Sequence, residues 1–341
     1  MTKRRCGLAV VTIAPLAIAL LMAACGGGRG AGGATHVRIA VGGASQLLYL
    51  PTTLAQQLGY YKDEGLDVEL DDFAGGSKAL EALVGGSADV VSGFYDHTIQ
   101  MAAEGREFVA FVTMLRYPGL VLAVSPKASG TVTSIEDLKG RIAGVTAAGS
   151  STQMLLTYLL TRHQVDPNDV SISAIGTAAT AIAAVEHGTV DVAMMADPAF
   201  TLVTRRDPAV RILADLRRAD GVKDAFGTSS YPGSVLYSSG AWIRAHPDTT
   251  ARLARAIRRT LEWMQAHSAA DIAAKMPPAF LGEDHALYVE ALGNSMTMYS
   301  PDGVMAADGA QIVRTLLAQS MEKVRNATID LSKTYTNQYV Q

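Results

Sequence analysis

A short segment occurs twice in this chain and constrains the fold more than any other feature. Residues 79–90, ALEALVGGSADV, align without a gap with residues 181–192, AIAAVEHGTVDV. Each copy has the pattern of an apolar helix that ends at a glycine, followed by a short strand that begins with Asp. Any two helix–strand units are somewhat alike, but short turns rich in small residues also precede both copies. The repeat therefore predicts two related lobes.

Strand-length and helical patterns alternate along the rest of the chain, which predicts an α/β fold with mostly parallel sheets and helices on both faces. Apolar runs indicate strands at residues 37–41, 67–70, 88–91, 108–114, 120–124, 141–145, 170–174, 190–194, 212–213 and 234–237. Helical spacing of apolar residues indicates helices at 46–58, 151–160, 177–187, 247–267, 284–293 and 304–325. Three more are indicated by one end alone: a helix that ends near Val84, one that begins at 93–97 and one that begins at 198. Residues 217–230 are expected to form a variable part that is rich in loops.

The N-terminal residues have the pattern of an export signal. Three basic residues at 3–5 precede an apolar stretch at 7–22 that is too short and too rich in alanine for a comfortable membrane span. The MAACG sequence that ends this stretch is similar to a bacterial lipoprotein cleavage site, which implies a signal peptide at 1–24 and a lipid on Cys25. A plain secretory signal with an incidental cysteine is the alternative. Glycine-rich residues 25–35 are expected to form a flexible tether.

Composition argues against several classes of function. Charged residues make up 18% and hydrophobic residues 49% of the chain, and the formal net charge is −3, so neither disorder nor a nucleic-acid partner is expected. The basic residues at 252–259 follow one helix. Both cysteines, Cys6 and Cys25, lie in the leader, so the folded body is predicted to have no disulfide, thiolate metal site or cysteine nucleophile. Neither a phosphate loop with lysine nor a His-Glu-x-x-His helix occurs, and we expect no cofactor and no metal.

A turn of small polar residues joins the expected strand at 141–145 to the expected helix at 151–160. Ser150 or Ser151 is a good N-cap, and the turn leaves N–H groups and the positive end of the helix dipole at the carboxyl edge of the sheet. This arrangement suits an anionic or strongly polar group. An ordinary strand–helix turn with a serine cap is the alternative.

Several segments, taken in order, resemble the periplasmic solute-binding proteins of nitrate-, sulfonate- and taurine-type ABC importers, the SsuA/THI5-like or NMT1 group. These segments are GYYKDEGLDV at 59–68, GSADV at 86–90, LKGRIAGV at 138–145, GSST at 149–152, and VDV at 190–192 with Asp197-Pro198. The resemblance covers about residues 36–300. It implies a type II periplasmic-binding fold, in which two α/β lobes joined by two hinge crossings close around a solute without chemical change.

The resemblance also implies the lobe boundaries, the location and the partners of the protein. The implied parts are lobe one at 36–123 and 238–341, lobe two at 124–237, and crossings near 121–125 and 235–239. The expected protein is a monomer in the periplasm or on the outside face of a membrane, anchored through lipidated Cys25. Its expected partners are a small-molecule solute and the permease and ATPase subunits of an importer.

The turns at the carboxyl ends of the strands supply the expected ligand contacts, because ligands of open α/β sheets sit there. They are Ser45, Gln46, Gly75, Gly76, Ser77, Phe94, Tyr95, Asp96, Arg116, Gly149, Ser150, Ser151, Thr152 and Asp197. The hydroxyl and N–H groups of the serine turn, together with Arg116, favour a small anion such as a sulfonate, nitrate or taurine. The rings of Phe94 and Tyr95, with Asp96 as an acceptor, favour instead a pyrimidine-like or other aromatic heterocycle. Tyr231, near the second crossing, is a candidate for closing the cleft.

Two other functions remain open besides a transport binding protein that is not an enzyme. An enzyme on the same fold, such as a desulfinase, would consume its substrate, whereas a binding protein shows saturable binding without turnover. The paired serines lack a nearby His and acid in the sequence, which does not exclude a triad formed in space. The second alternative is the detached sensor lobe of a signalling system, and a gene for a receptor beside the gene for this chain would support it.

Overall fold

The computed structural model describes residues 34–282 and 284–341, and residues from Ala34 to Gln341 form one compact unit. The expected signal peptide, Cys25 and most of the expected tether lie outside the described residues, so these expectations stay predictions. None of the helices in the described part combines the length and the apolar character needed to cross a membrane.

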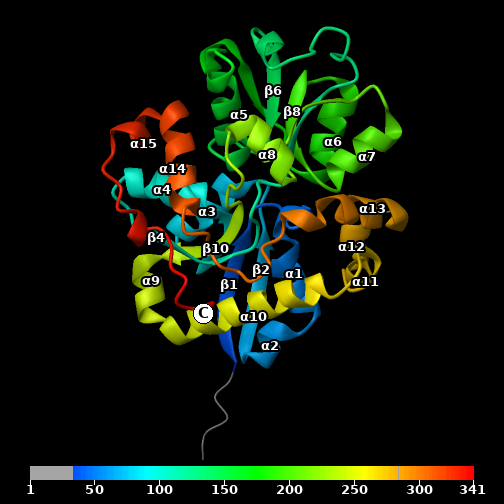
Figure 1. Cartoon of the computed structure of the whole chain (residues 1–341). Coiled ribbons are helices and arrows are strands. Elements are labelled where there is room, and N and C mark those ends of the chain that lie inside the picture. The colour runs from blue at the N-terminus through cyan, green and yellow to red at the C-terminus, as the bar shows by residue number, and fades with distance from the viewer. Residues whose placement is uncertain (1–33, 283) are drawn as a thin grey trace, which may run out of the picture. The chain divides into compact units, whose positions relative to one another are not determined.

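The first sheet has five strands in the order β2-β1-β3-β10-β4. They are β1 (Thr35–Val41), β2 (Leu66–Asp72), β3 (Val90–Phe94), β4 (Phe108–Thr113) and β10 (Ser234–Ser239). β1 pairs in parallel with β2 and β3, whereas β10 runs antiparallel to both β3 and β4. Four strands therefore share one direction, and β10, which comes from much later in the chain, opposes them (Figure 1). We call this sheet and the helices packed on it the first lobe.

The sheet of the second lobe repeats this arrangement in the order β7-β6-β8-β5-β9. Its strands are β5 (Leu120–Val124), β6 (Ile142–Val145), β7 (Ser171–Ala174), β8 (Val192–Ala196) and β9 (Arg211–Asp215). β6 pairs in parallel with β7 and β8, and β5 is the strand that opposes its neighbours. The repeated segments fall at equivalent places, on α3 and β3 in one lobe and on α6 and β8 in the other. Two α/β lobes of one topology are therefore confirmed; each sheet is mixed, with four of its five strands in one direction and one opposed.

Helices cover both faces of each sheet (Figure 1). The α-helices are α1 (Leu50–Gln57), α2 (Tyr60–Asp63), α3 (Gly76–Val84), α4 (Asp96–Ala103), α5 (Ser151–Arg162), α6 (Ala178–His187), α7 (Ala199–Arg206), α8 (Ala219–Phe226), α9 (Gly240–Ala245), α10 (Pro247–Gln265), α11 (Ala269–Ala273), α12 (Pro278–Leu281), α13 (His285–Ser295), α14 (Gly309–Ser320) and α15 (Glu322–Asn326). The 3-10 turns are η1 (Leu47–Tyr49), η2 (Glu136–Leu138), η3 (Pro167–Asp169), η4 (Met296–Met298) and η5 (Leu331–Lys333).

The part expected to be rich in loops at 217–230 contains a helix that the sequence did not indicate, because α8 lies inside this range. Its apolar face consists of Val222, Ala225 and Phe226, which are buried at helical spacing. A single turn of apolar residues among charged ones is too short a pattern to indicate a helix before the lobe packs on it.

The crossings between the sheets precede the strands at which they were expected. β5 belongs to the second sheet and β10 to the first, so the chain crosses at 114–119 and at 216–233. The expected crossings at 121–125 and 235–239, and with them the lobe boundaries at 123 and 237, are wrong. The strand directly after each crossing enters its new sheet antiparallel to its neighbours, and an apolar strand pattern does not reveal which sheet it joins.

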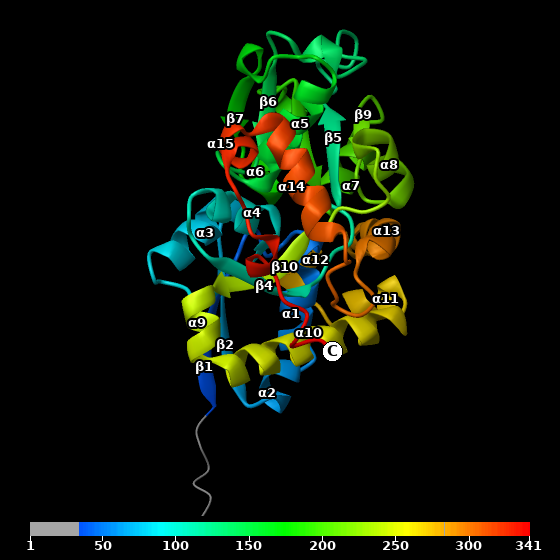
Figure 2. The same ribbon diagram turned by 60° about the vertical axis from the view of Figure 1, so that its left-hand side comes forward.

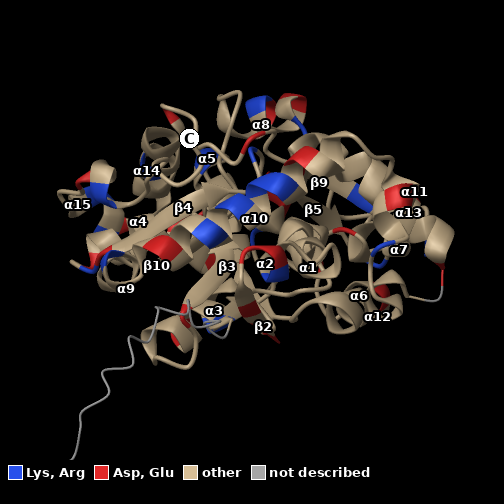
Figure 3. Cartoon of the chain, turned by 90° about the horizontal axis from the view of Figure 1, so that it is seen from below, with Lys and Arg blue, Asp and Glu red and all other residues tan. Residues whose placement is uncertain are grey.

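Helix α10 carries the basic run that the sequence shows at 252–259, visible as blue segments in Figure 3. Arg255 pairs with Glu64 at 2.8 Å and Arg259 with Asp63 at 3.0 Å, both from the neighbouring helix α2 and the turn that follows it. Arg252 pairs with an acid of its own helix. The positive charge of this face is therefore largely matched by carboxylates.

The C-terminal third of the chain packs on both lobes. Helix α14 lies against α4 of the first lobe and α5 of the second lobe, as Figure 2 shows from the side. Helix α13 contacts α7 of the second lobe. These helices therefore bridge the lobes away from the two crossings.

Candidate functional site

The turn at the start of α5 is held in one conformation by side chains of the helix itself. The N–H of Thr146 donates to Thr152 Oγ1 at 3.0 Å, and the two threonine hydroxyls lie 2.9 Å apart. Gly149 adopts a φ of 76°, and its N–H donates to Gln153 Oε1 at 2.8 Å. The end of β6 is thereby tied to the first turn of α5, and Ser150 and Ser151 are fixed at the helix N-terminus.

The start of α3 in the first lobe lies directly against this serine turn. The N–H of Ser77 donates to Ser150 Oγ at 3.1 Å, and the Ser77 hydroxyl donates to the Ala148 carbonyl at 2.8 Å. The two serine hydroxyls lie 3.1 Å apart. A Cβ atom on Gly75 would lie 3.0–3.1 Å from atoms of Ala147, Ser150 and Thr146. The two turns that the sequence places at strand ends therefore meet across the lobes.

A buried carboxylate lies beside the same turn. Asp96, the first residue of α4, is fully buried, and its Oδ1 accepts from the Ser151 hydroxyl of the second lobe at 2.7 Å. The hydroxyl of Tyr231, in the second crossing, is 3.4 Å from Oδ2. Burial raises the pKa of Asp96 above its ordinary value. One side chain thus joins the first lobe, the second lobe and a crossing segment.

His97 follows Asp96 and is also fully buried. Its Nδ1 lies 3.3 Å from the Tyr237 hydroxyl, while Nε2 has no hydrogen-bond partner among the described residues. Burial lowers the pKa of His97. The imidazole is therefore favoured in its neutral form and does not supply the cleft with positive charge.

The facing turns enclose a cavity of about 10 Å³. Six of the expected contact residues line it, and the full lining is Gly42, Gln46, Leu48, Tyr49, Gly76, Phe94, Leu120, Thr146, Ser150, Ser151 and Thr152. No lysine or arginine is among these residues. A space of this size holds about one water molecule, so a solute larger than water needs the lobes further apart than they are here.

A wider pocket of about 560 Å³ lies on the other side of Gln46, which lines both spaces. Its walls come from α6 and α7 of the second lobe and from α12 and α13. Most of its wall is apolar, including Ile182, Leu202 and Phe280. Two further expected contact residues, Ser45 and Asp197, reach this pocket. Eight of the fourteen expected residues therefore line one of the two spaces, and six line neither: Gly75, Ser77, Tyr95, Asp96, Arg116 and Gly149.

Three of the expected contact residues have other partners. The hydroxyl of Tyr95 pairs with Thr334 at 2.5 Å, away from the cavity. Arg116 is exposed and donates to the Thr297 carbonyl at 3.0 Å. Asp197 accepts from Arg217, Ser295 and both the N–H and hydroxyl of Thr201, and its carbonyl accepts from Leu47 N–H at 2.9 Å. Asp197 therefore braces the lobes whatever else it contacts.

Several lining residues were missed by the sequence reasoning. Tyr49 and Leu48 come from the 3-10 turn before α1 and read as ordinary core, and Tyr49 packs edge-on against Phe94 with ring centres 6.4 Å apart. Leu120 is the first residue of the strand expected at 120–124, where the pattern indicates core packing. The only available signal was position, because each follows a strand end or a crossing. Among the described residues no group of His, Cys, Asp and Glu side chains is placed to hold a metal ion.

Comparisons with known proteins place this geometry in a family. The chain matches the family model described as NMT1/THI5 like over residues 48–270. A protein of known structure from Bordetella bronchiseptica RB50 is 40% identical with a TM-score of 0.86, covering 90% of this chain and 96% of that chain. YtlA of Bacillus subtilis (strain 168) is 24% identical over 281 residues, 81% of each protein.

The alkanesulfonate-binding protein SsuA from Xanthomonas axonopodis pv. citri, solved with MOPS bound, has the same fold. It is 18% identical with a TM-score of 0.68, over 89% of this chain and 98% of that one. The family match extends over more than half of the sequence, and the paired lobes agree with it. This chain belongs to the NMT1/THI5-like family and has the fold of the type II periplasmic binding proteins of ABC importers.

Proposed function

We propose that this protein is the solute-binding component of an ABC-type importer and captures a small solute between its lobes. The observation that carries the proposal is the meeting of the two lobes at the Ser77–Ser150 and Asp96–Ser151 hydrogen bonds. Hydroxyl and N–H groups that pair with each other across the closed lobes are the groups that an entering solute would take over. Motion at 114–119 and 216–233 opens the cleft, and closure around solute gives the permease a distinct shape to recognise.

A binding screen with a turnover control tests this proposal. The purified chain is heated with alkyl- and arylsulfonates, nitrate, carboxylates and pyrimidines, and a ligand raises the melting temperature by mass action. The best ligand is then recovered after long incubation and analysed by mass spectrometry. Saturable binding with intact ligand supports a binding protein, whereas a consumed ligand supports an enzyme. Loss of the shift in a Ser150→Ala, Ser151→Ala double variant assigns the ligand to the serine turn.

A small anion is the first candidate class of solute. The N-termini of α3 and α5 face the same cavity, and each presents N–H groups and the positive end of a helix dipole. The hydroxyls of Ser150, Ser151 and Thr152 add donors, which would exchange their present partners Ser77, Asp96 and Thr146 for oxygen atoms of the solute. A sulfonate or nitrate group is bound by such donors without a cationic side chain.

An aromatic heterocycle with an amine or ring N–H is the second candidate class. The cavity lining has no lysine or arginine, and it includes the rings of Tyr49 and Phe94. Asp96 does not line the cavity itself but accepts a hydrogen bond from Ser151, which does. A buried carboxylate repels an anion and attracts an N–H donor or a cation. On charge, the lining accommodates this class better than the anion.

The variant Asp96→Asn separates the two classes, because asparagine keeps an acceptor for Ser151 and removes the negative charge. An anionic ligand is expected to bind more tightly to the variant, and an amine or ring N–H donor about tenfold or more weakly. Titration calorimetry of the best ligand against both proteins measures the sign of the change. The control is Asp72→Asn, a carboxylate that accepts from Ala44 N–H at 2.7 Å outside the cavity lining.

The apolar pocket beyond Gln46 is proposed to hold the remainder of a larger solute. Its Arg205 and Arg206 are paired with Glu290 and Glu186, so their charges are already matched. An uncharged ring or alkyl group suits this space. Gln46→Ala is expected to change the preference among ligands of different tail length more than the affinity for the shortest ligand, as a calorimetric series measures.

We also propose that Cys25 is lipidated and holds the protein at the outside face of a membrane. The support is the leader pattern of the sequence, and the anchor would keep the binding lobes near their permease. Metabolic labelling with palmitate, with and without Cys25→Ser, tests it. Label in the variant, or protein released from membranes in both forms, contradicts the anchor.

A further inference from the structure

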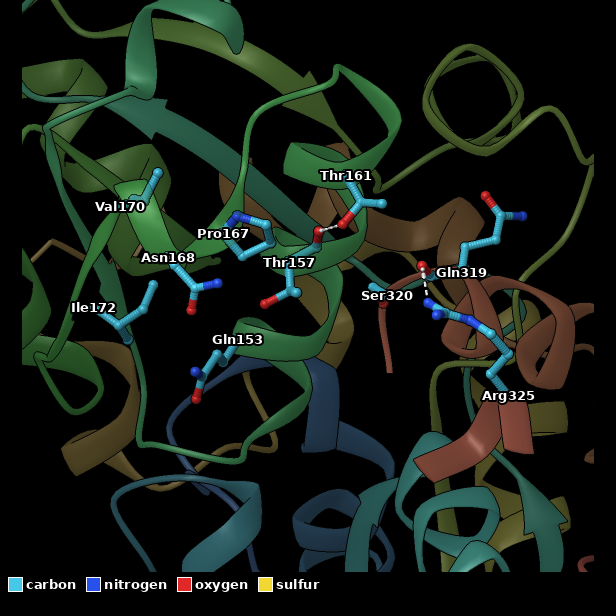
Figure 4. A pocket seen from close by; sticks show the side chains of 10 residues that line it. All are labelled: Gln153, Thr157, Thr161, Pro167, Asn168, Val170, Ile172, Gln319, Ser320 and Arg325. Carbon is cyan, nitrogen blue, oxygen red and sulfur yellow. Dashed lines mark hydrogen bonds between the residues drawn. The ribbon is translucent and has the colours of Figure 1, made fainter. Parts of the chain in front are cut away.

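A second pocket between the lobes lies behind the serine turn and has a different chemistry from the cleft. It has a volume of about 660 Å³, and none of its lining residues belongs to the two spaces described above. One wall comes from α5, η3 and β7 of the second lobe, and the other from the end of α14 and from α15 (Figure 4). A molecule in this pocket would touch both lobes.

Arg325 is the charged residue of this pocket. Its guanidinium donates to the carbonyls of Ala318 and Gln319 at 2.8 and 2.9 Å. No carboxylate in the described part of the chain lies within ion-pair distance of it, whereas Lys323 on the same short helix pairs with Glu104 at 3.1 Å. An arginine without a carboxylate partner at a pocket wall is a ready site for the acid group of a ligand.

Hydroxyl and amide groups face Arg325 across the pocket (Figure 4). Thr161 donates its proton to the Thr157 carbonyl at 2.8 Å, which leaves the Thr161 oxygen as an acceptor. Asn168 donates from its amide nitrogen to Asp166 at 3.0 Å, which leaves the amide oxygen as an acceptor. These acceptors suit the hydroxyl hydrogens of a ligand and do not suit a second acid group.

Ser320 is packed into this wall, and its hydroxyl is not open to a ligand in the present arrangement. Its Oγ is shielded from solvent and has no hydrogen-bond partner among the described residues. A buried polar atom without a partner costs about 1–3 kcal/mol, so this hydroxyl lowers the stability of the wall and adds no donor to the pocket surface. Ser320 lies next to Arg325 on the pocket wall (Figure 4).

We propose that this pocket binds a small hydroxylated anion, such as a sugar acid or a sugar phosphate. Arg325 takes the acid group, and Thr161 and Asn168 take the hydroxyls. The site is separate from the solute cleft, but Gln153 lines the pocket and also accepts from the Gly149 N–H of the serine turn at 2.8 Å. Occupancy therefore favours the closed arrangement of the lobes and acts on the cleft through α5.

The test uses the full chain and three probes: sodium gluconate, glucose 6-phosphate and uncharged glucose. We expect at least one of the two anions to bind at millimolar or tighter affinity by calorimetry, and glucose at least tenfold more weakly. Arg325→Gln is expected to reduce anion binding at least tenfold. The matched control is Arg211→Gln, which removes an exposed arginine from β9 outside this pocket.

Two further variants keep the outcome independent of the packing of Arg325. Thr161→Val removes an acceptor from the opposite wall and should weaken anion binding, whereas Ser320→Ala removes a buried, unpartnered hydroxyl behind the wall and should leave binding unchanged without lowering stability. Absence of binding by both anions up to about 10 mM overturns the proposal. So does binding that survives Arg325→Gln, or binding that disappears in the Ser150→Ala, Ser151→Ala variant while Arg325→Gln retains it, because the probe would then occupy the cleft.

Discussion

At the scale of single residues, Asp96 has the most consequences for the molecule. It is fully buried, accepts from Ser151 of the other lobe, and has no cationic partner within ion-pair distance in the described part of the chain. Replacing water around a carboxylate with hydroxyl donors leaves its charged form less favourable than in the unfolded chain. The residue therefore couples protonation to folding.

Asp96→Asn is expected to change how stability depends on pH. The pKa of Asp96 in the folded protein lies above its ordinary value of 3.8. The contribution of this shift to the free energy of unfolding is therefore fully present below pH 3.8, and it is lost as the pH rises through the raised pKa. The free energy of unfolding of the variant, relative to the natural chain, should therefore increase from pH 4 upward. Urea unfolding of both proteins across this range measures it, and a difference independent of pH contradicts the assignment.

Gly75 illustrates how one missing side chain sets the approach of the lobes. Its φ of 157° already favours glycine, and an added Cβ would lie within 3.1 Å of three residues of the other lobe. Gly75→Ala should therefore hold the lobes apart, with a larger radius of gyration in solution scattering. Gly86→Ala is the matched control, because Gly86 has a φ of 77° and no atom within 4 Å of the added Cβ. Each variant should lose about 1 kcal/mol of stability from backbone strain, and only the first should expand.

At the scale of elements, the junction of β6 and α5 determines where the serine hydroxyls lie. Thr152 reaches back one turn to Thr146, so the strand end and the helix start form one rigid unit. A helix N-terminus presents its N–H groups usefully only when the preceding turn keeps them aimed at the cleft.

Thr152→Val is expected to lower stability by about 1–2 kcal/mol, because it leaves the Thr146 N–H without its acceptor while preserving side-chain shape. Thr157→Val on the same helix is the control, since the Thr157 hydroxyl makes no hydrogen bond with the described residues, and its change should stay within about 0.5 kcal/mol. Chemical unfolding of both variants provides the comparison. Equal losses would show that helix propensity, not the Thr146 contact, is responsible.

At the scale of the whole molecule, the lobes are joined in two ways besides the hydrogen bonds between their facing turns. One is the pair of crossings, and the other is the packing of α13 and α14 on the second lobe. With the cavity at the serine turn limited to about 10 Å³, the closed arrangement leaves no space there for any group of a solute larger than water. Opening must therefore precede binding.

A pair of cysteines tests this order of events. Ser77→Cys and Ser150→Cys replace hydroxyls that lie 3.1 Å apart, in a chain whose Cys6 and Cys25 are changed to serine. The oxidised protein should lose binding of the best solute at least tenfold and regain it on reduction, while each single cysteine variant binds in both states. Full binding by the oxidised form would contradict a cleft between these turns.

Much of this arrangement was predictable from local patterns. The repeat at 79–90 and 181–192 predicted two lobes of one topology. A helix or a strand can be recognised from the spacing of apolar residues within a short stretch of sequence, so no knowledge of distant contacts was needed. The same reasoning identified the turns that meet at Ser77 and Ser150, since strand ends of parallel sheets share an edge. It did not identify which sheet β5 and β10 complete, because strand pairing depends on partners far away in the sequence.

The sequence by itself determined the α/β class, the repeated lobes and the chemical character of the turns, all of which depend on neighbours within a few residues along the chain. Only the tertiary structure decided that Asp197 braces the lobes, that Arg116 faces away from the cavity, and that Asp96 is buried beside Ser151. Burial and hydrogen-bond partners depend on segments that are far apart in the sequence and meet only in the folded protein. From the sequence alone, each of these three side chains could equally well lie on the surface.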